Sequence, residues 1–154
     1  MGYALLDATT DPATILDCGI VPVLVSASPA DRLVSIAAAL EGLIARHAPA
    51  ALAVERLYFN KNARTAMRVA EARGVAILCA GRAGMAVAEY TPQEVKLSVT
   101  GTGGADKKQV QRMLTVVLGL AEPITQDNVA DAVAIALAHA QRERFGAAVA
   151  LASG

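Results

Sequence analysis

The run Ala50-Ala51-Leu52-Ala53-Val54-Glu55 decides the fold class, because five small or apolar residues in succession end in an acid. A short, continuous apolar run is typical of a strand that is buried on both faces. Apolar residues at helical spacing precede it from Leu33 to Ile44, and a second helix is predicted from about Asn62 to Ala83, interrupted at Gly74. This alternation predicts an α/β protein whose sheet is flanked by helices.

The rest of the chain extends this pattern at both ends. Two apolar runs, Tyr3–Leu6 and Thr14–Val25, flank a turn and predict a hairpin, which would make the sheet mixed. A further strand is expected at Met85–Tyr90 and a helix from about Asp106 to Leu118. Thr125 is the expected cap of a last helix that runs to about Phe145.

Two helix starts carry capping sequences. Ser28-Pro29 combines a cap with a proline suited to the first helical position, and Pro49 is expected to stop that helix. Thr91-Pro92-Gln93-Glu94 adds the reciprocal glutamate of a capping box. These positions predict helix boundaries independently of the apolar spacing.

Length and composition indicate one domain. The 154 residues are 55% hydrophobic and 18% charged, with no Trp, so we expect a single domain over residues 1–145 and a loose tail over residues 146–154. No apolar run reaches the roughly 18 residues that span a bilayer, and the N-terminus lacks the features of a signal peptide. The protein is therefore expected to be soluble and cytoplasmic.

Charge is distributed unevenly although the formal net charge is zero. Residues 51–112 hold ten Lys or Arg against five Asp or Glu, whereas residues 1–50 are mainly acidic. The neutral total argues against a protein coated in positive charge. A basic middle segment can nevertheless bind phosphate groups.

Glu55 is the first candidate for a functional residue. Open α/β sheets place ligands at the carboxyl ends of their strands, which is where Glu55 lies. The alternative is that Glu55 is only the first solvated residue after a buried strand.

Asp127, Asn128 and Asp131 lie on nearly one face at the start of the last helix. Their oxygen atoms are ligands that Mg²⁺ or Mn²⁺ accepts. For Asp127 and Asn128 the alternative is capping or interaction with the helix dipole. Asp131 lies within an apolar run and is the better candidate, whereas His139 is expected to be a packing or surface residue.

The glycine-rich stretch Gly101–Lys108 matches neither of the common phosphate-loop patterns, GxxxxGK[ST] and GxGxxG. Nucleotide binding is therefore a weak hypothesis. A flexible basic loop is the preferred interpretation, with Lys107, Lys108 and Arg112 available for DNA phosphates.

A second basic group follows Glu55 in the sequence. Arg64 and Arg68 are one helical turn apart and begin beside Lys61, so they form either a phosphate-binding stripe or an ordinary solvated face. Tyr58-Phe59 serves either in loop packing or in stacking on unpaired bases.

Taken together, these motifs resemble the RuvC family of Holliday-junction resolvases over nearly the whole chain. The resemblance implies a ribonuclease H-like fold that acts as a homodimer. The segments that carry it are Val54–Ala63, Ala72-Arg73-Gly74-Val75, Tyr90-Thr91-Pro92, Val95-Lys96, Lys107–Val110 and Ala130–Ala136.

The resemblance also implies roles for single residues. The family's strand-end glutamate falls on Glu55, its last aspartate on Asp131, and its base-contacting aromatic residue on Tyr58. Its two lysines near the scissile phosphate fall on Lys96 and Lys107. Asn128 occupies a position where the family has Asp or His, so Asp127 is an alternative ligand.

The start of the chain departs from the family pattern. The family opens with an apolar strand and a Gly-Ile-Asp-Pro-Gly motif before a Thr-Gly-Tyr-like sequence, of which Met1-Gly2-Tyr3 matches only the end. The resemblance therefore implies that the central first strand and its catalytic aspartate are missing from this sequence. Asp7 ends the next strand and is no equivalent.

The implied function is a structure-selective endonuclease for four-way DNA junctions in recombination and repair. The resemblance implies two Mg²⁺ or Mn²⁺ ions per site, a homodimer and a complex with a branch-migration helicase, and no membrane. The alternative is a junction-binding protein without catalysis, because the first aspartate is absent. A nucleotide-binding, ATPase-like domain ranks last.

Overall fold

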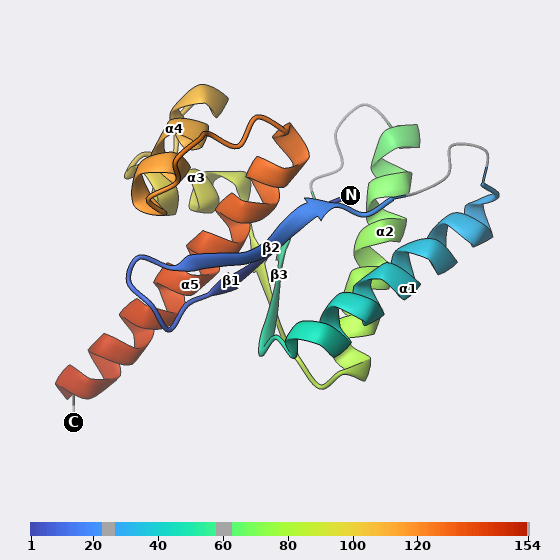
Figure 1. The fold of residues 1–154 in the computed structure, drawn as a ribbon, viewed down its shortest axis with the longest axis horizontal. Helices are drawn as coiled ribbons and strands as arrows, with labels where there is room; N and C mark the ends of the chain where they lie inside the picture. The colour runs from blue at the N-terminus through green and yellow to red at the C-terminus, as the bar shows by residue number, and fades with distance from the viewer. Residues whose placement is uncertain (23–26, 58–62, 154) are drawn as a thin grey trace. The chain divides into compact units, whose positions relative to one another are not determined.

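The computed structural model describes residues 1–22, 27–57 and 63–153, without the side chains of residues 63–65 and 145–153 (Figure 1). Two compact units make up the chain. Unit 1 consists of Met1 and Val21–Glu89, and unit 2 of Gly2–Ile20 and Tyr90–Gly154. The expectation of one domain over residues 1–145 stays a prediction.

The described residues of unit 1 form two helices and a two-stranded sheet. Its elements are α1 (Pro29–His47), β3 (Ala51–Glu55), α2 (Ala63–Arg82) and β4 (Ala86–Tyr90), whose last residue belongs to unit 2. Helices α1 and α2 pack against each other, and β3 pairs with β4. Strand β3 confirms the apolar run as a strand that ends at Glu55.

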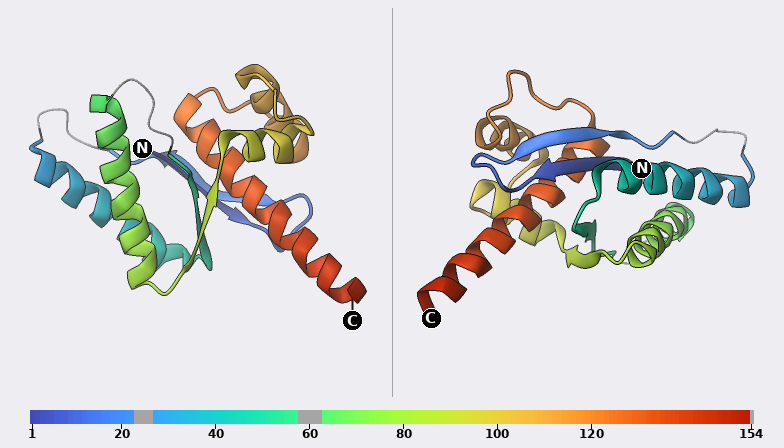
Figure 2. Two further views of the ribbon diagram at one scale, coloured as in Figure 1. Left: turned by 180° about the vertical axis from the view of Figure 1, so that it is seen from behind. Right: turned by 60° about the horizontal axis from the view of Figure 1, so that its bottom comes forward.

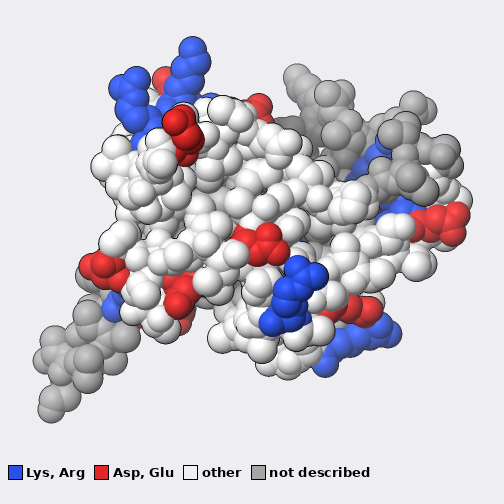
Figure 3. All heavy atoms as spheres, viewed as in Figure 1, with Lys and Arg blue, Asp and Glu red and all other residues white. Residues whose placement is uncertain are grey.

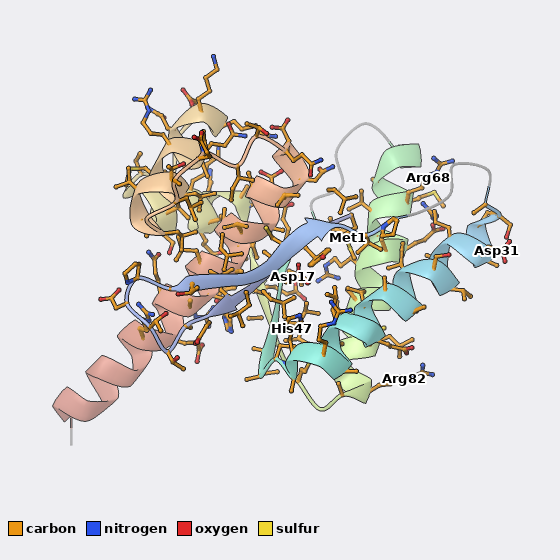
Figure 4. The ribbon with its side chains drawn as sticks, in the orientation of Figure 1. Met1, Asp17, Asp31, His47, Arg68 and Arg82 are labelled. Atoms are coloured by element: carbon orange, nitrogen blue, oxygen red, sulfur yellow. The ribbon has the colours of Figure 1, made fainter. Side chains whose placement is uncertain are left out.

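Ion pairs and buried side chains join α1 to α2. Arg32 pairs with Glu71. Arg82, the last residue of α2 (labelled in Figure 4), pairs with Glu41 at 3.8 Å. Ile36 is buried on α1, and the buried residues of α2 are Ala76, Cys79 and Ala80. Burial of small apolar residues lets the two helices approach closely.

The ends of α1 follow the predicted capping chemistry. The Asp31 backbone N–H donates to Ser28 Oγ at 3.1 Å, and Ala48 ends the helix with a positive φ of 44°. The interruption predicted at Gly74 was wrong, because α2 is continuous from Ala63 to Arg82. A glycine costs a helix only about 1 kcal/mol relative to alanine, so packing of α2 against α1 outweighs that cost.

Unit 2 contains the predicted hairpin and three helices. Strands β1 (Gly2–Asp7) and β2 (Thr14–Ile20) are antiparallel, with Gly2 opposite Ile20 and Asp7 opposite Thr14. The hairpin packs along helix α5 (Asp127–Ser153), as the views in Figure 2 show. Among the described strands, hydrogen bonding forms two ladders, β1–β2 and β3–β4.

Helices α3 (Pro92–Thr100) and α4 (Lys107–Val117) also pack on α5. Thr91 and Asp106 cap them with complete capping boxes. Leu114 and Val133 are fully buried and form the centre of this core.

Helix α5 is longer than predicted, since it ends at Ser153 and not near Phe145. Residues 146–153 are rich in alanine, which has the highest helix propensity. None of the described helices is long and apolar enough to cross a membrane.

Candidate active site

Two helix starts in unit 2 bring together a lysine, a glutamine and two aspartates. Lys107 Nζ lies 3.0 Å from Asp127 Oδ2 and 3.9 Å from Asp131 Oδ2. Gln111 Nε2 donates to Asp127 Oδ1 at 3.3 Å. We call these four residues the acidic cluster, because two carboxylates face one ammonium group.

Local sequence explains why these side chains share one region. Lys107 is the first residue of α4 after the Asp106 cap, and Gln111 lies one turn later on the same face. Asp127 begins α5, and Asp131 follows it by one turn. The opposite side of α5 is buried, so the two aspartates remain on the exposed side.

The environment shifts the pKa values of the pair. Burial by surrounding protein atoms raises the pKa of Asp131 above its usual value, although 59% of the side chain is exposed. Lys107 opposes this shift and Asp127 adds to it. The hydrogen bond with Asp127 is the main cause of a raised pKa for Lys107, which keeps the ammonium charged.

The donor set of the acidic cluster suits a hard divalent cation. Mg²⁺ is usually held by one or two carboxylates and retains several waters. Asp127 and Asp131 meet this description, and Asn128 offers an exposed amide oxygen in the same turn. Within the described ranges no group of three His, Cys, Asp or Glu is placed to hold a metal.

Glu55 lies in unit 1, at the exposed end of β3. Arg73 Nε donates to its backbone carbonyl at 3.2 Å. Arg73 Nη2 also lies 2.7 Å from Glu89 Oε1, and Arg56 Nε lies 3.8 Å from Glu89 Oε2. We call Arg56, Arg73 and Glu89 the arginine cluster.

Sequence reasoning missed the arginine cluster and the contribution of Gln111. No spacing rule links a helix residue such as Arg73 with Glu89 on a later strand. The position of Gln111, one turn after Lys107, was visible in the sequence and pointed to a shared face.

The predicted lysines differ in their surroundings. Lys96 is half-buried on α3, where its backbone carbonyl accepts from Thr100 Oγ1 at 2.8 Å. Across the part of the chain that the structure describes, its ammonium forms no ion pair. The structure therefore brings Lys107, but not Lys96, into contact with the carboxylates.

The predicted DNA-binding residues are partly described. Lys108 and Arg112 are exposed on α4, where Lys and Arg side chains gather (Figure 3), and line a shallow cavity of about 300 Å³. Arg68 is exposed on α2 (Figure 4). Tyr58, Lys61 and the side chain of Arg64 lie outside the described residues.

His139 is a packing residue, as expected. Its Nδ1 lies 2.8 Å from the hydroxyl of Tyr90, and the two rings meet edge to face. This pair belongs to the contact between α5 and the end of β4 and not to the acidic cluster.

The fold and the acidic cluster define a class of protein: an α/β protein whose carboxylates suit a divalent metal. The family described as "Crossover junction endodeoxyribonuclease RuvC" matches residues 1–139. The chain therefore belongs to the RuvC family of crossover junction endodeoxyribonucleases, a class of hydrolases.

Individual relatives agree with this assignment. The RuvC of Moorella thermoacetica is 47% identical over 142 residues, which cover 91% of this chain and 84% of the relative. That of Pelotomaculum thermopropionicum is 42% identical over 139 residues, covering 90% of this chain and 85% of the relative.

Solved structures agree as well. Thermus thermophilus RuvC superimposes with a TM-score of 0.86 at 32% identity, covering 94% of this chain and 89% of that one. T. thermophilus RuvC in complex with Holliday junction substrate superimposes with a TM-score of 0.83 at 30% identity, covering 94% of this chain and 88% of that one. The predicted ribonuclease H-like α/β fold is thereby confirmed.

Proposed function

We propose that this protein is a structure-selective endonuclease that resolves four-way DNA junctions by metal-dependent hydrolysis of phosphodiesters, in recombination and repair. Family membership over residues 1–139 carries the proposal. The relative that was solved in complex with Holliday junction substrate supports the four-way junction as the substrate.

The acidic cluster is the proposed metal-binding region. Asp131 and Asp127 or Asn128 would hold Mg²⁺ or Mn²⁺, two ions per site, with Glu55 as a ligand assigned from the family pattern. Such ions activate water and stabilise the departing oxygen in phosphodiester hydrolysis. The arrangement of two carboxylates around one ammonium group supports this assignment, because it leaves a surplus of negative charge for a metal.

The lysines have a second proposed role. Lys107 would balance the negative charge that builds up on the phosphate, because its ammonium lies beside the carboxylates. Lys96 would act in the same way and is assigned from the family pattern alone. Both would hold the scissile phosphate or stabilise its charge.

The exposed basic residues would bind the DNA backbone. Lys108 and Arg112 on α4 and Arg68 on α2 are exposed cations, as phosphate contacts require. Lys61 and Arg64 would add phosphate contacts, and Tyr58 would stack on opened bases. The homodimer, the branch-migration helicase partner and the cytoplasmic location stay predictions.

A cleavage assay with matched DNA tests the proposal. A labelled four-way junction and a linear duplex of the same sequence are incubated with the chain in Mg²⁺ or Mn²⁺, beside Asp131→Asn. We expect junction cleavage that depends on the metal and is lost in the variant. Junction-selective binding without cleavage would instead support the non-catalytic alternative, and equal affinity for duplex and junction would contradict both.

A further inference from the structure

Strand β1 approaches the backbone of helix α5 at Gly2, a residue without a side chain. A Cβ atom on Gly2 would lie 1.9 Å from the carbonyl oxygen of Asn128 and 2.5 Å from its carbonyl carbon. It would also lie 3.1 Å from the backbone nitrogen of Val129. All three are backbone atoms, so no change of rotamer relieves the overlap.

Both partners of this contact have further neighbours in the fold. Gly2 is paired with Ile20 on β2, and the next residue, Tyr3, lies opposite Gly19. On the helix, Val129 and Ala130 are only 4% and 1% exposed. A shift of the strand would therefore disturb its pairing with β2, and a shift of the first turn of α5 would disturb the packing of Val129 and Ala130.

The turn that Gly2 contacts is the turn that carries the candidate ligands. Asn128 lies between Asp127 and Asp131, and both carboxylates face Lys107 across the gap to α4. A displacement of the Asn128 carbonyl moves both carboxylates with it, because they belong to the same rigid helical turn.

We infer that Gly2 is a positioning residue for the acidic cluster: the absence of a side chain at Gly2 fixes where the first turn of α5 lies against β1. The expected effect of Gly2 on catalysis rests on the proposed function, whereas the position of the first turn of α5 against β1 does not. A Cβ atom at this position lies 1.9 Å from the Asn128 carbonyl oxygen, so the approach must widen by about 1.5 Å before ordinary contact distances return. Misplacement of a catalytic group by about 1 Å can cost about 100-fold in rate.

Gly2→Ala is the direct test, and two other glycines supply matched controls. A Cβ on Gly19 would have as its three nearest neighbours atoms of the Tyr3 side chain, at 3.3 to 3.4 Å, so Gly19→Ala perturbs the same hairpin at a side chain that can yield. A Cβ on Gly74 meets nothing within 4 Å, so Gly74→Ala reports the effect of an added methyl group alone.

The first measurement is the backbone amide NMR spectrum of the metal-free chain. Gly2→Ala is expected to shift the resonances of residues 127–131 and of Lys107, while Gly19→Ala leaves them in place. Unchanged resonances in Gly2→Ala would overturn the inference. In the unsubstituted protein, nuclear Overhauser contacts from the Gly2 α protons to the Val129 amide are expected, and their absence would overturn it as well.

The second measurement separates positioning from stability. In single-turnover cleavage of a four-way junction, Gly2→Ala is expected to lose about 100-fold in rate while junction affinity stays within about threefold. Both control variants are expected to cleave at nearly the original rate. Equal losses in Gly2→Ala and Gly19→Ala, or failure of Gly2→Ala alone to fold, would replace the positioning role with a purely structural one.

The two proposals fail in different ways. If neither the original chain nor any variant cleaves the junction, but Gly2→Ala still shifts the amide resonances of residues 127–131, the proposed function is wrong and the positioning of the turn stands. If the original chain cleaves and Gly2→Ala cleaves equally well, the proposed function stands and the positioning role is wrong.

Discussion

The acidic cluster of unit 2 and the arginine cluster of unit 1 are built from the same kind of exposed ion pair but carry opposite surplus charge. In the acidic cluster Asp127 and Asp131 share the single ammonium of Lys107. In the arginine cluster Arg73 and Arg56 share the single carboxylate of Glu89. The first arrangement favours a bound cation and the second favours an anionic group such as phosphate.

The two clusters also differ in how they are held. The acidic cluster lies at the starts of two helices, where the dipoles stabilise negative charge and Gln111 orients Asp127. The arginine cluster joins a helix to a strand, and Arg73 is fixed by two acceptors at once. Ion-pair distance alone therefore does not tell which ligand a cluster favours, whereas the sign of its surplus charge does.

The largest expected effect is on the acidic cluster. Asp131→Asn removes one ligand charge and is expected to lower the junction cleavage rate by about 1000-fold, equivalent to about 4 kcal/mol in the barrier. The rate is measured at saturating junction DNA, with Glu143→Gln, an exposed acid on the same helix, as control. A similar loss in both variants would show that the acidic cluster has no special role.

Lys107→Met removes the ammonium group of the acidic cluster and so increases its difference in charge from the arginine cluster. Two unpaired carboxylates should bind Mn²⁺ more tightly, while cleavage falls by about 100-fold because the phosphate loses its charged partner. Titration calorimetry with Mn²⁺ and the cleavage assay measure the two effects. Lys107→Arg keeps the charge and should retain the original Mn²⁺ affinity; tighter binding by that variant would argue against competition between ammonium and metal.

In the arginine cluster the expected effect is on stability. Arg73→Met removes the pair with Glu89 and the donor to Glu55, and is expected to cost about 1 kcal/mol of unfolding free energy in urea, since both partners are partly exposed. Arg56→Met, whose pair distance is 3.8 Å, should cost less than about 0.5 kcal/mol. Equal costs would mean that the short contact of Arg73 contributes nothing extra.

The smallest expected effect is the pH dependence that Asp131 contributes. Burial raises the pKa of the Asp131 carboxyl in the folded state. Protonated Asp131 therefore stabilises the protein at pH values below the pKa that Asp131 has in the unfolded chain. This stabilisation is lost as the pH rises through the pKa that Asp131 has in the folded protein. Asp131→Asn should therefore be more stable than the original chain at pH 7 but not at pH 3. Urea unfolding at both pH values, without metal, measures the difference; an advantage that grows towards acid pH would contradict the sign.

Much of the fold followed from local patterns in the sequence. The Ser28 and Thr91 caps, the Ala51–Glu55 strand and the opening hairpin were all predicted, because each depends on neighbouring residues. Gly74 and the end of α5 were mispredicted. Packing of α2 against α1 outweighs the cost of Gly74, and the high helix propensity of alanine extends α5 to Ser153.

The sequence by itself determined the family, the element order and the identity of Asp131 and Lys107 as candidates. Only the tertiary structure decided that Lys107 pairs with Asp127, that Arg73 pairs with Glu89, and that Gly2 meets the Asn128 carbonyl. These contacts join residues that are far apart in the chain. Their geometry depends on how whole elements pack, and no local periodicity or capping rule contains that information.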